Sequence, residues 1–238
     1  MENPMISRLN DMARNAYASE TASYMGVALK SFLLVAIVIA SAFATWYFGY
    51  ATPTTTTVTA IMGLVCALVV SFKPTMAGFL SPLYAILEGM CLASISFALE
   101  MMYPGIVMNA VMLTFGIALA AAAIYSRGLV TVNARFMRFT MVALVGVMLA
   151  YLGEAVLSLF GVNFPSLSGS GPLGIGVSIV VIGVATLSLF MDYEVINQSV
   201  QQSMPKDYEW YCAFSLLVTL IWLYVEALDL LRKISSRD

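Results

Sequence analysis

The chain has 238 residues, of which 61% are hydrophobic and 10% are charged, and its net charge is −2. A soluble domain carries about 25% charged residues, so this composition, with a mean hydropathy of +0.91, indicates a membrane protein and not a nucleic-acid-binding one. The sequence contains no histidine, which excludes the catalytic triads and metal sites that depend on this residue. We therefore expect neither enzymatic activity nor a bound cofactor.

Seven apolar segments are candidates for membrane-spanning helices, each of which needs about 20 apolar residues. In chain order they are residues 27–50, 57–72, 76–99, 105–125, 139–160, 172–191 and 210–231. The sequence therefore predicts an all-α, polytopic membrane protein with a seven-transmembrane-helix bundle over residues 27–231. A cytoplasmic segment, residues 1–26, precedes the bundle, and a basic tail, residues 232–238, follows it. The first segment is polar and mixed in sign, unlike a cleavable signal peptide.

The segments between these spans are rich in turn-forming or polar residues, and we predict that they are loops. They are residues 51–57, 72–75, 103–105, 126–138, 161–172 and 194–209.

Basic residues are distributed unequally between the two sides of the predicted bundle. Eight lie on the side of the N-terminus, which are Arg8, Arg14, Lys30, Lys73, Arg127, Arg135, Arg138 and Lys206, and the loops of the other side carry none. Because Lys and Arg favour the cytoplasm, we expect a cytoplasmic N-terminus. Arg232, Lys233 and Arg237 then fall on the outer side, so the last helix either crosses fully or enters partway and returns. We favour the full crossing because residues 210–231 are long enough for it.

Ionisable residues inside a bilayer are candidates for function. Glu88 lies near the middle of the third span with no basic residue within a helical turn. It therefore lines the interior of the bundle or a water-filled cavity, or else is a neutral acid that fixes helix packing. Gly89 beside it is of the kind that permits close approach of two helices.

The last span carries two acids, Glu226 and Asp229. Asp229 has Arg232 and Lys233 three and four residues later, which is the spacing of ion pairs on one helix. Glu226 has no basic residue at these positions. The spacing therefore explains Asp229 as structural and leaves Glu226 in need of a tertiary partner.

Asp192 comes directly after the sixth span. It is either an interfacial acid paired with Lys73 or Arg135, or a functional residue. Because acids dominate the interior of the predicted membrane domain, a pathway for Ca²⁺ or H⁺ is favoured over one for anions.

We expect the remaining polar and reactive residues of the spans to have structural and not functional roles. Lys30 is close enough to the start of its helix to extend its ammonium to the interface, and Glu154 is expected at the rim of its span. Cys66, Cys91 and Cys212 are widely separated in apolar segments, so we expect buried thiols and no metal site.

Three stretches carry a family resemblance: "PLYAILEGMCLASIS" (82–96), "YPGIVMNAVMLTFGIAL" (103–119) and the C-terminal region 191–234 with its "YEWYxAF…WLYxE" pattern. They resemble the Bax inhibitor (transmembrane Bax inhibitor motif) family, most of all its bacterial branch, over about residues 20–234. The resemblance implies a central C-terminal helix wrapped by the other six. It also implies a pH-sensitive Ca²⁺ leak channel in the bacterial cytoplasmic (inner) membrane.

The family's pH sensor is a pair of acids that share a proton and hold the pore shut, and by motif these are Asp192 and Glu226. The resemblance also implicates Lys73 as a charge partner. The second helix lacks the acid that some bacterial members carry, and Glu88 is a candidate to replace it as a pore-lining or ion-binding residue. On antiparallel helices Asp192 and Glu226 lie far apart, so a direct bond between them is an open hypothesis.

The function predicted from the sequence is a pH-sensitive Ca²⁺ leak channel gated by intramembrane acids, whose partners are the lipid bilayer, Ca²⁺ and H⁺. Ca²⁺ is the transported ion, and Asp192 and Glu226 are the residues available to contact it. Two alternatives remain open: an H⁺-coupled cation antiporter, and a non-transporting membrane regulator of stress or proteolysis machinery.

Overall fold

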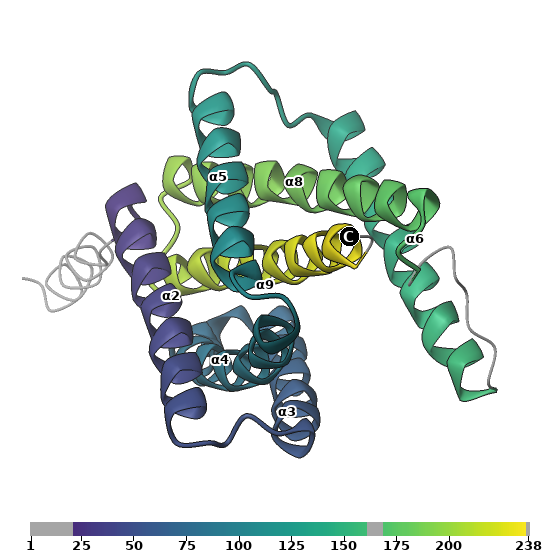
Figure 1. Ribbon diagram of the computed structural model, residues 1–238. Coiled ribbons are helices and arrows are strands. Elements are labelled where there is room, and N and C mark those ends of the chain that lie inside the picture. Colours follow the sequence, from purple (N-terminus) through teal and green to yellow (C-terminus); the bar gives the residue numbers. More distant parts are fainter. Residues whose placement is uncertain (1–20, 161–168, 237–238) are drawn as a thin grey trace, which may run out of the picture.

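The computed structural model describes residues 21–160 and 169–236, which form helices joined by short turns (Figure 1). In chain order the elements are α2 (Tyr24–Tyr47), α3 (Pro53–Phe72), the 3₁₀ turn η1 (Pro74–Met76), α4 (Ala77–Met102), α5 (Ile106–Ser126), α6 (Ala134–Leu159), α8 (Pro172–Gln201) and α9 (Tyr208–Ser235). Within the described residues, seven helices are long and apolar enough to cross a membrane, when η1 is counted with α4. The chain is therefore a multi-pass membrane protein with the predicted all-α fold.

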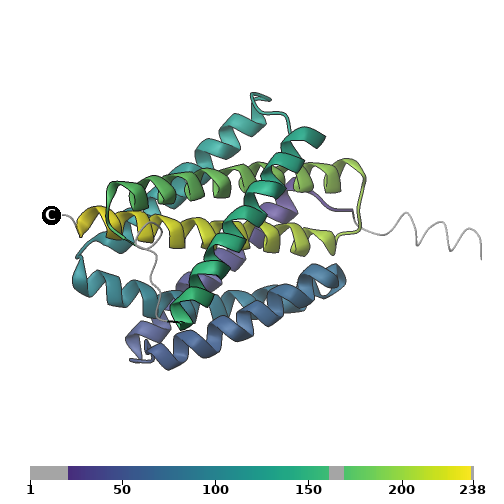
Figure 2. The ribbon, with the colours of Figure 1, turned by 90° about the vertical axis from the view of Figure 1, so that its right-hand side faces the viewer.

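Helix α9 occupies the centre of the bundle. It contacts α2, α4, α5 and α8, and it runs alongside α8 over most of its length (Figures 1 and 2). Helix α3 packs mainly on α4, and α6 packs mainly on α8. The expected central position of the last helix is therefore confirmed, but four helices, and not six, form most of its surroundings.

The last helix is unbroken over its 28 residues, which corresponds to a length of about 42 Å. This exceeds the hydrocarbon core of a bilayer, about 30 Å thick. The geometry therefore agrees with a full crossing and not with a segment that enters partway and returns.

Helix α3 begins earlier than the sequence pattern suggests. The hydroxyl of Thr52 accepts a hydrogen bond from the backbone N–H of Thr55 at 3.2 Å, and Pro53 occupies the first helical turn. A Thr cap followed by Pro is a favoured helix start. Most of residues 51–57, which we predicted to be a turn, therefore belongs to the helix.

Helix α8 continues well beyond the end predicted for it, because the first half of the polar stretch 194–209 is also helical. Polar side chains there bond one turn apart, as when Gln198 donates to Glu194 at 2.8 Å. The extension places Asp192 nine residues before the end of the helix at Gln201, or about 14 Å inside it.

Helix α6 also begins within a predicted loop, residues 126–138. The side chain of Asn133 caps it by accepting hydrogen bonds from the backbone N–H groups of Arg135 and Phe136, at 3.1 and 2.9 Å. A basic first turn is expected where a helix emerges from the lipid into the headgroup region, which explains why hydropathy alone places this boundary too late.

Helices α2 and α4 approach closely at Gly89, as the sequence suggested. A Cβ atom added at Gly89 would lie 2.5 Å from the carbonyl oxygen of Val38 and 2.8 Å from Cβ of Ser41. At the same contact, the hydroxyl of Ser41 donates to the carbonyl of Ile86 at 2.8 Å. Because the nearest atom is backbone, a larger residue here requires the helices to separate.

We expect Gly89→Leu to destabilise the bundle by about 1–3 kcal/mol, the usual cost of forcing extra atoms into a packed contact. The measurement is thermal unfolding of the purified protein in detergent. Gly116→Leu on α5 is the matched control, because no atom lies within 4 Å of a Cβ added there. Equal melting temperatures for the two variants would contradict the assigned contact.

Candidate functional site: the polar seam between helices α8 and α9

One face of α9 carries residues with polar groups at alternating intervals of three and four along nearly its whole length. They are Cys212, Ser215, Thr219, Trp222, Glu226, Asp229 and Lys233. This spacing keeps them on one side of a helix with 3.6 residues per turn. Helix α8 supplies buried polar side chains of its own, which are Ser178, Ser188, Asp192 and Ser199. We call these eleven side chains the polar seam.

Asp192 is the acid of the seam nearer the end at which α8 turns into α9. Its side chain is 7% exposed, and its Oδ1 accepts a hydrogen bond from the hydroxyl of Ser215 at 2.5 Å. Its other oxygen, Oδ2, is buried and has no hydrogen-bond partner among the described residues. Two turns further along α8, Ser199 Oγ accepts a hydrogen bond from the Cys212 thiol at 3.4 Å. The seam therefore holds a carboxylate that its neighbours satisfy on one oxygen.

Glu226 is the second buried acid of the seam, and it is 4% exposed. Its Oε1 accepts hydrogen bonds from the hydroxyl of Tyr151 on α6 at 2.7 Å and from the indole N–H of Trp222 at 3.0 Å. The predicted need for a tertiary partner is confirmed, and the partner is Tyr151. This bond ties α6, which otherwise packs mainly on α8, to the central helix.

The structure does not bring Asp192 and Glu226 together. Glu226 lies eleven residues after Ser215, the partner of Asp192, which is about 16 Å along α9. Between these levels lie Leu189 and Leu223, both fully buried. The direct bond implied by the family resemblance is therefore absent here. Because a short turn joins α8 to α9, the position of each acid along the bundle is set by the number of residues between it and that turn.

Asp229 closes the other end of the seam with the predicted ion pairs. Its carboxylate accepts from Arg232 at 2.5 Å and from Lys233 at 2.7 Å. The hydroxyl of Ser178 on α8 also donates to Asp229, at 3.1 Å, and accepts from Lys233 at 2.9 Å. Lys233 is 2% exposed. The charge of one carboxylate is thus shared by two of the three basic residues near the C-terminus.

The other two predicted site residues lie outside the seam. Glu88 is half-buried and faces α3, where its Oε1 would lie 2.9 Å from a Cβ atom added at Gly63. Lys73 is exposed in the turn after α3. Within residues 21–160 and 169–236 no ion pair joins it to Asp192 or Glu226. The structure therefore places neither residue beside Asp192 or Glu226.

A buried ion pair that the sequence analysis missed joins the first and last described helices. Glu209 is 1% exposed, pairs with Lys30, and accepts from the backbone N–H and the hydroxyl of Ser23 at 2.9 and 3.0 Å. The carboxylate occupies the space that a side chain at Gly26 would need. The ammonium of Lys30 also lies 5.3 Å from the ring centroid of Trp210, so it is held in place beside the start of α9.

Two sequence signals pointed to this contact. Lys30 interrupts an apolar run, and a charge in such a position needs a partner. Glu209 lies within the "YEWY" motif at the start of the last helix. Sequence alone could not match the two, because 179 residues separate them.

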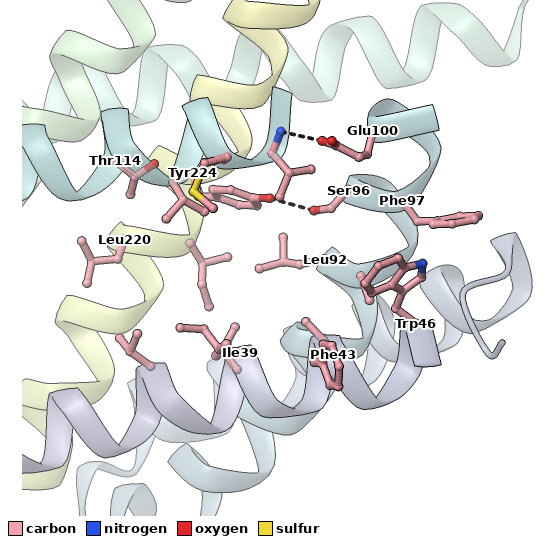
Figure 3. Close-up of a pocket in the computed structure, with 18 of the residues that line it drawn as sticks. Ile39, Phe43, Trp46, Leu92, Ser96, Phe97, Glu100, Thr114, Leu220 and Tyr224 are labelled. Carbon is pink, nitrogen blue, oxygen red and sulfur yellow. Dashed lines mark hydrogen bonds between the residues drawn. The ribbon is translucent and has the colours of Figure 1, made fainter. Parts of the chain in front are cut away.

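The opposite face of α9 borders an apolar groove of about 550 Å³ lined by α2, α4, α5 and α9 (Figure 3). Buried side chains such as Leu92 and Leu217 form its floor, and exposed ones such as Phe43 and Phe115 form its rim. Among its few polar side chains, Ser96 and Tyr224 share a hydrogen bond of 2.8 Å.

Comparison with known proteins places this architecture in a family. The family model described as Bax inhibitor 1 like matches residues 3–236. The chain belongs to the Bax inhibitor 1-like family. Neither curated proteins nor solved structures gave a match. The family predicted from the C-terminal motif is confirmed, and the seam and the groove are features of a Bax inhibitor 1-like protein.

We expect Lys30→Met in this Bax inhibitor 1-like protein to lower stability by about 3 kcal/mol, because it leaves the Glu209 carboxylate buried without its cation. The double variant Lys30→Met/Glu209→Gln should recover much of that loss, since the uncompensated charge is gone. Thermal unfolding of the four proteins of this cycle in detergent gives the coupling. A double variant whose loss equals the sum of the two single losses would contradict a direct pair.

Proposed function

We propose that this protein provides a pH-sensitive pathway for Ca²⁺ through the polar seam, with Asp192 and Glu226 as its sensor and gate. The observation that carries the proposal is the Asp192 carboxylate, which is buried between α8 and α9 and has one oxygen without a hydrogen-bond partner among the described residues. Membership in the Bax inhibitor 1-like family supports it. A buried, incompletely satisfied acid at membrane depth is costly and is usually functional.

The pH dependence follows from the charge of this acid. When Asp192 is protonated, it carries no charge, so its contact with Ser215 leaves no ion that needs solvation and the seam stays dry. When it is ionised, the second oxygen requires water or a cation, because an uncompensated charge in a low dielectric is strongly unfavourable. Raising the pH through the titration of this group therefore favours a wetter seam and a higher cation flux.

A layer of apolar side chains separates the two acids and supplies the barrier. Leu189 and Leu223 are both fully buried, and a dry constriction of this kind blocks ions by excluding water. Trp222, adjacent to Leu223, donates its indole N–H to Glu226. A change in the charge of Glu226 alters this bond and, with it, the packing of the layer.

The described residues hold no cluster of three or more His, Cys, Asp or Glu that could cage a metal ion. Ca²⁺ prefers six to eight oxygen ligands, so transit along the seam fits better than tight binding. A single carboxylate beside a hydroxyl suits a proton equally well. This feature of Asp192 supports a second candidate, an H⁺-coupled cation antiporter. For either function we propose an inner-membrane location with a cytoplasmic N-terminus, as the basic residues favour.

The test is Ca²⁺ entry into liposomes that contain the purified protein, measured from pH 5 to pH 8. We expect the flux to rise with pH in the wild type and to lose most of this dependence in Asp192→Asn and Glu226→Gln. Glu88→Gln removes a half-buried acid on the α3 side of the bundle and is the matched control. If Glu88→Gln alone changed the pH profile of the flux, the pathway would lie between α3 and α4 and not along the polar seam.

Two other outcomes separate the remaining functions. Ca²⁺ that accumulates against its gradient when a proton gradient is applied would identify an antiporter. A folded protein with no flux at any pH would rule out transport and favour the membrane regulator of stress or proteolysis machinery.

A further inference from the structure

We propose that the apolar groove binds one acyl chain of a phospholipid whose headgroup carries an ammonium group, from the leaflet at the C-terminal end of α2. The groove, shown in Figure 3, has a volume of about 550 Å³. This lies within the range of small-molecule pockets, about 300–1,000 Å³. The proposal concerns lipid binding and does not depend on ion transport.

The length of the groove matches one leaflet. Its lining on α2 extends from Val35 to Trp46, a separation of eleven residues or about 16 Å. The hydrocarbon core of a bilayer is about 30 Å thick, so the groove covers about half of it. An acyl chain from the opposite leaflet would not reach this part of the bundle.

The walls of the groove favour a flexible hydrocarbon chain over a protein segment. Its floor is buried and apolar, formed by residues such as Leu92, Ala93 and Leu217. Its rim consists of exposed apolar side chains on helices that span the membrane, including Ile39 and Phe115. A polypeptide inserted here would need partners for its backbone polar groups, whereas a hydrocarbon chain needs none.

The position of the mouth is set by aromatic residues at the end of α2. Phe43, Trp46 and Tyr47 form contacting ring pairs there, and Trp and Tyr concentrate at the level of lipid headgroups. Trp46 on α2 and Phe97 on the adjacent α4 are 6.4 Å apart between ring centroids. The lipid headgroup should therefore lie just beyond these rings.

The charge at the mouth selects the headgroup. Glu100 lines the groove two residues before the end of α4, and it accepts hydrogen bonds from the backbone N–H groups of Gly105 and Val107 at 2.6 and 3.0 Å. The lining includes no Lys or Arg. A lone carboxylate at this level attracts an ammonium group and disfavours a net anionic lipid.

The experiment uses the full-length protein, reconstituted in bilayers of equal parts phosphatidylethanolamine and phosphatidylglycerol and then extracted into mild detergent. Native mass spectrometry counts the lipids that stay bound. We expect one retained phospholipid, mainly phosphatidylethanolamine. No retained lipid, or a preference for phosphatidylglycerol, would overturn the proposal.

Two pairs of variants test the site itself. Val111→Trp fills the groove from α5 and should remove most of the retained lipid, whereas Val65→Trp adds the same bulk on the exposed face of α3 and should not. If Val111→Trp does not fold, Ala42→Trp fills the groove from α2. Equal retention in the filled and control proteins would refute the groove as the binding site.

The headgroup preference is tested with Glu100→Gln, which keeps an acceptor for the α5 backbone but removes the charge. We expect it to reduce the preference for phosphatidylethanolamine by about two- to fivefold, the effect of a partly exposed charge pair. Glu154→Gln removes a half-buried acid on α6, outside the lining of the groove, and is the control. An unchanged preference in Glu100→Gln would show that the carboxylate does not select the lipid.

Discussion

The architecture depends on one constraint: the central helix carries ionisable and hydroxyl side chains through a medium that does not solvate them. Such groups need hydrogen-bond or ion-pair partners, and several on α9 find them on a neighbouring helix. Glu209 finds Lys30 and Ser23 on the α2 side, Ser215 bonds Asp192 on α8, and Glu226 reaches Tyr151 on α6. These bonds fix which helices surround α9 and at what level each of them crosses it.

The two long faces of α9 have opposite characters. The face toward α8 is polar, and the face toward α2, α4 and α5 is apolar where it borders the groove. A rotation or tilt of α9 would therefore change the hydration of the seam and the shape of the groove together. The proposed pathway for ions and the proposed site for lipid would then be mechanically linked, because they share a single helix.

Hydropathy and residue spacing were sufficient to predict the number of spans, the close contact at Gly89 and the ion pairs of Asp229, whereas the central last helix was predicted from the family resemblance. The first three features are local, or follow from counting apolar residues. Helix ends were predicted less well, since the Thr52 and Asn133 caps and the bonds within residues 194–201 extend helices into polar sequence. Contacts between residues far apart in the sequence, such as Lys30 and Glu209, depend on tertiary packing. They could not be predicted from a single sequence. The level of Asp192 relative to Glu226 followed from the longer α8 and could not be read from the motif.

The pairing of Lys30 with Glu209 has a consequence for how the protein is made. The two residues are 179 positions apart, and a ribosome adds about 5–20 residues per second. Helix α2 is therefore synthesised about 10–35 s before the counter-ion of Lys30 exists. This ion pair between α2 and α9 can form only after the start of the last helix has been made.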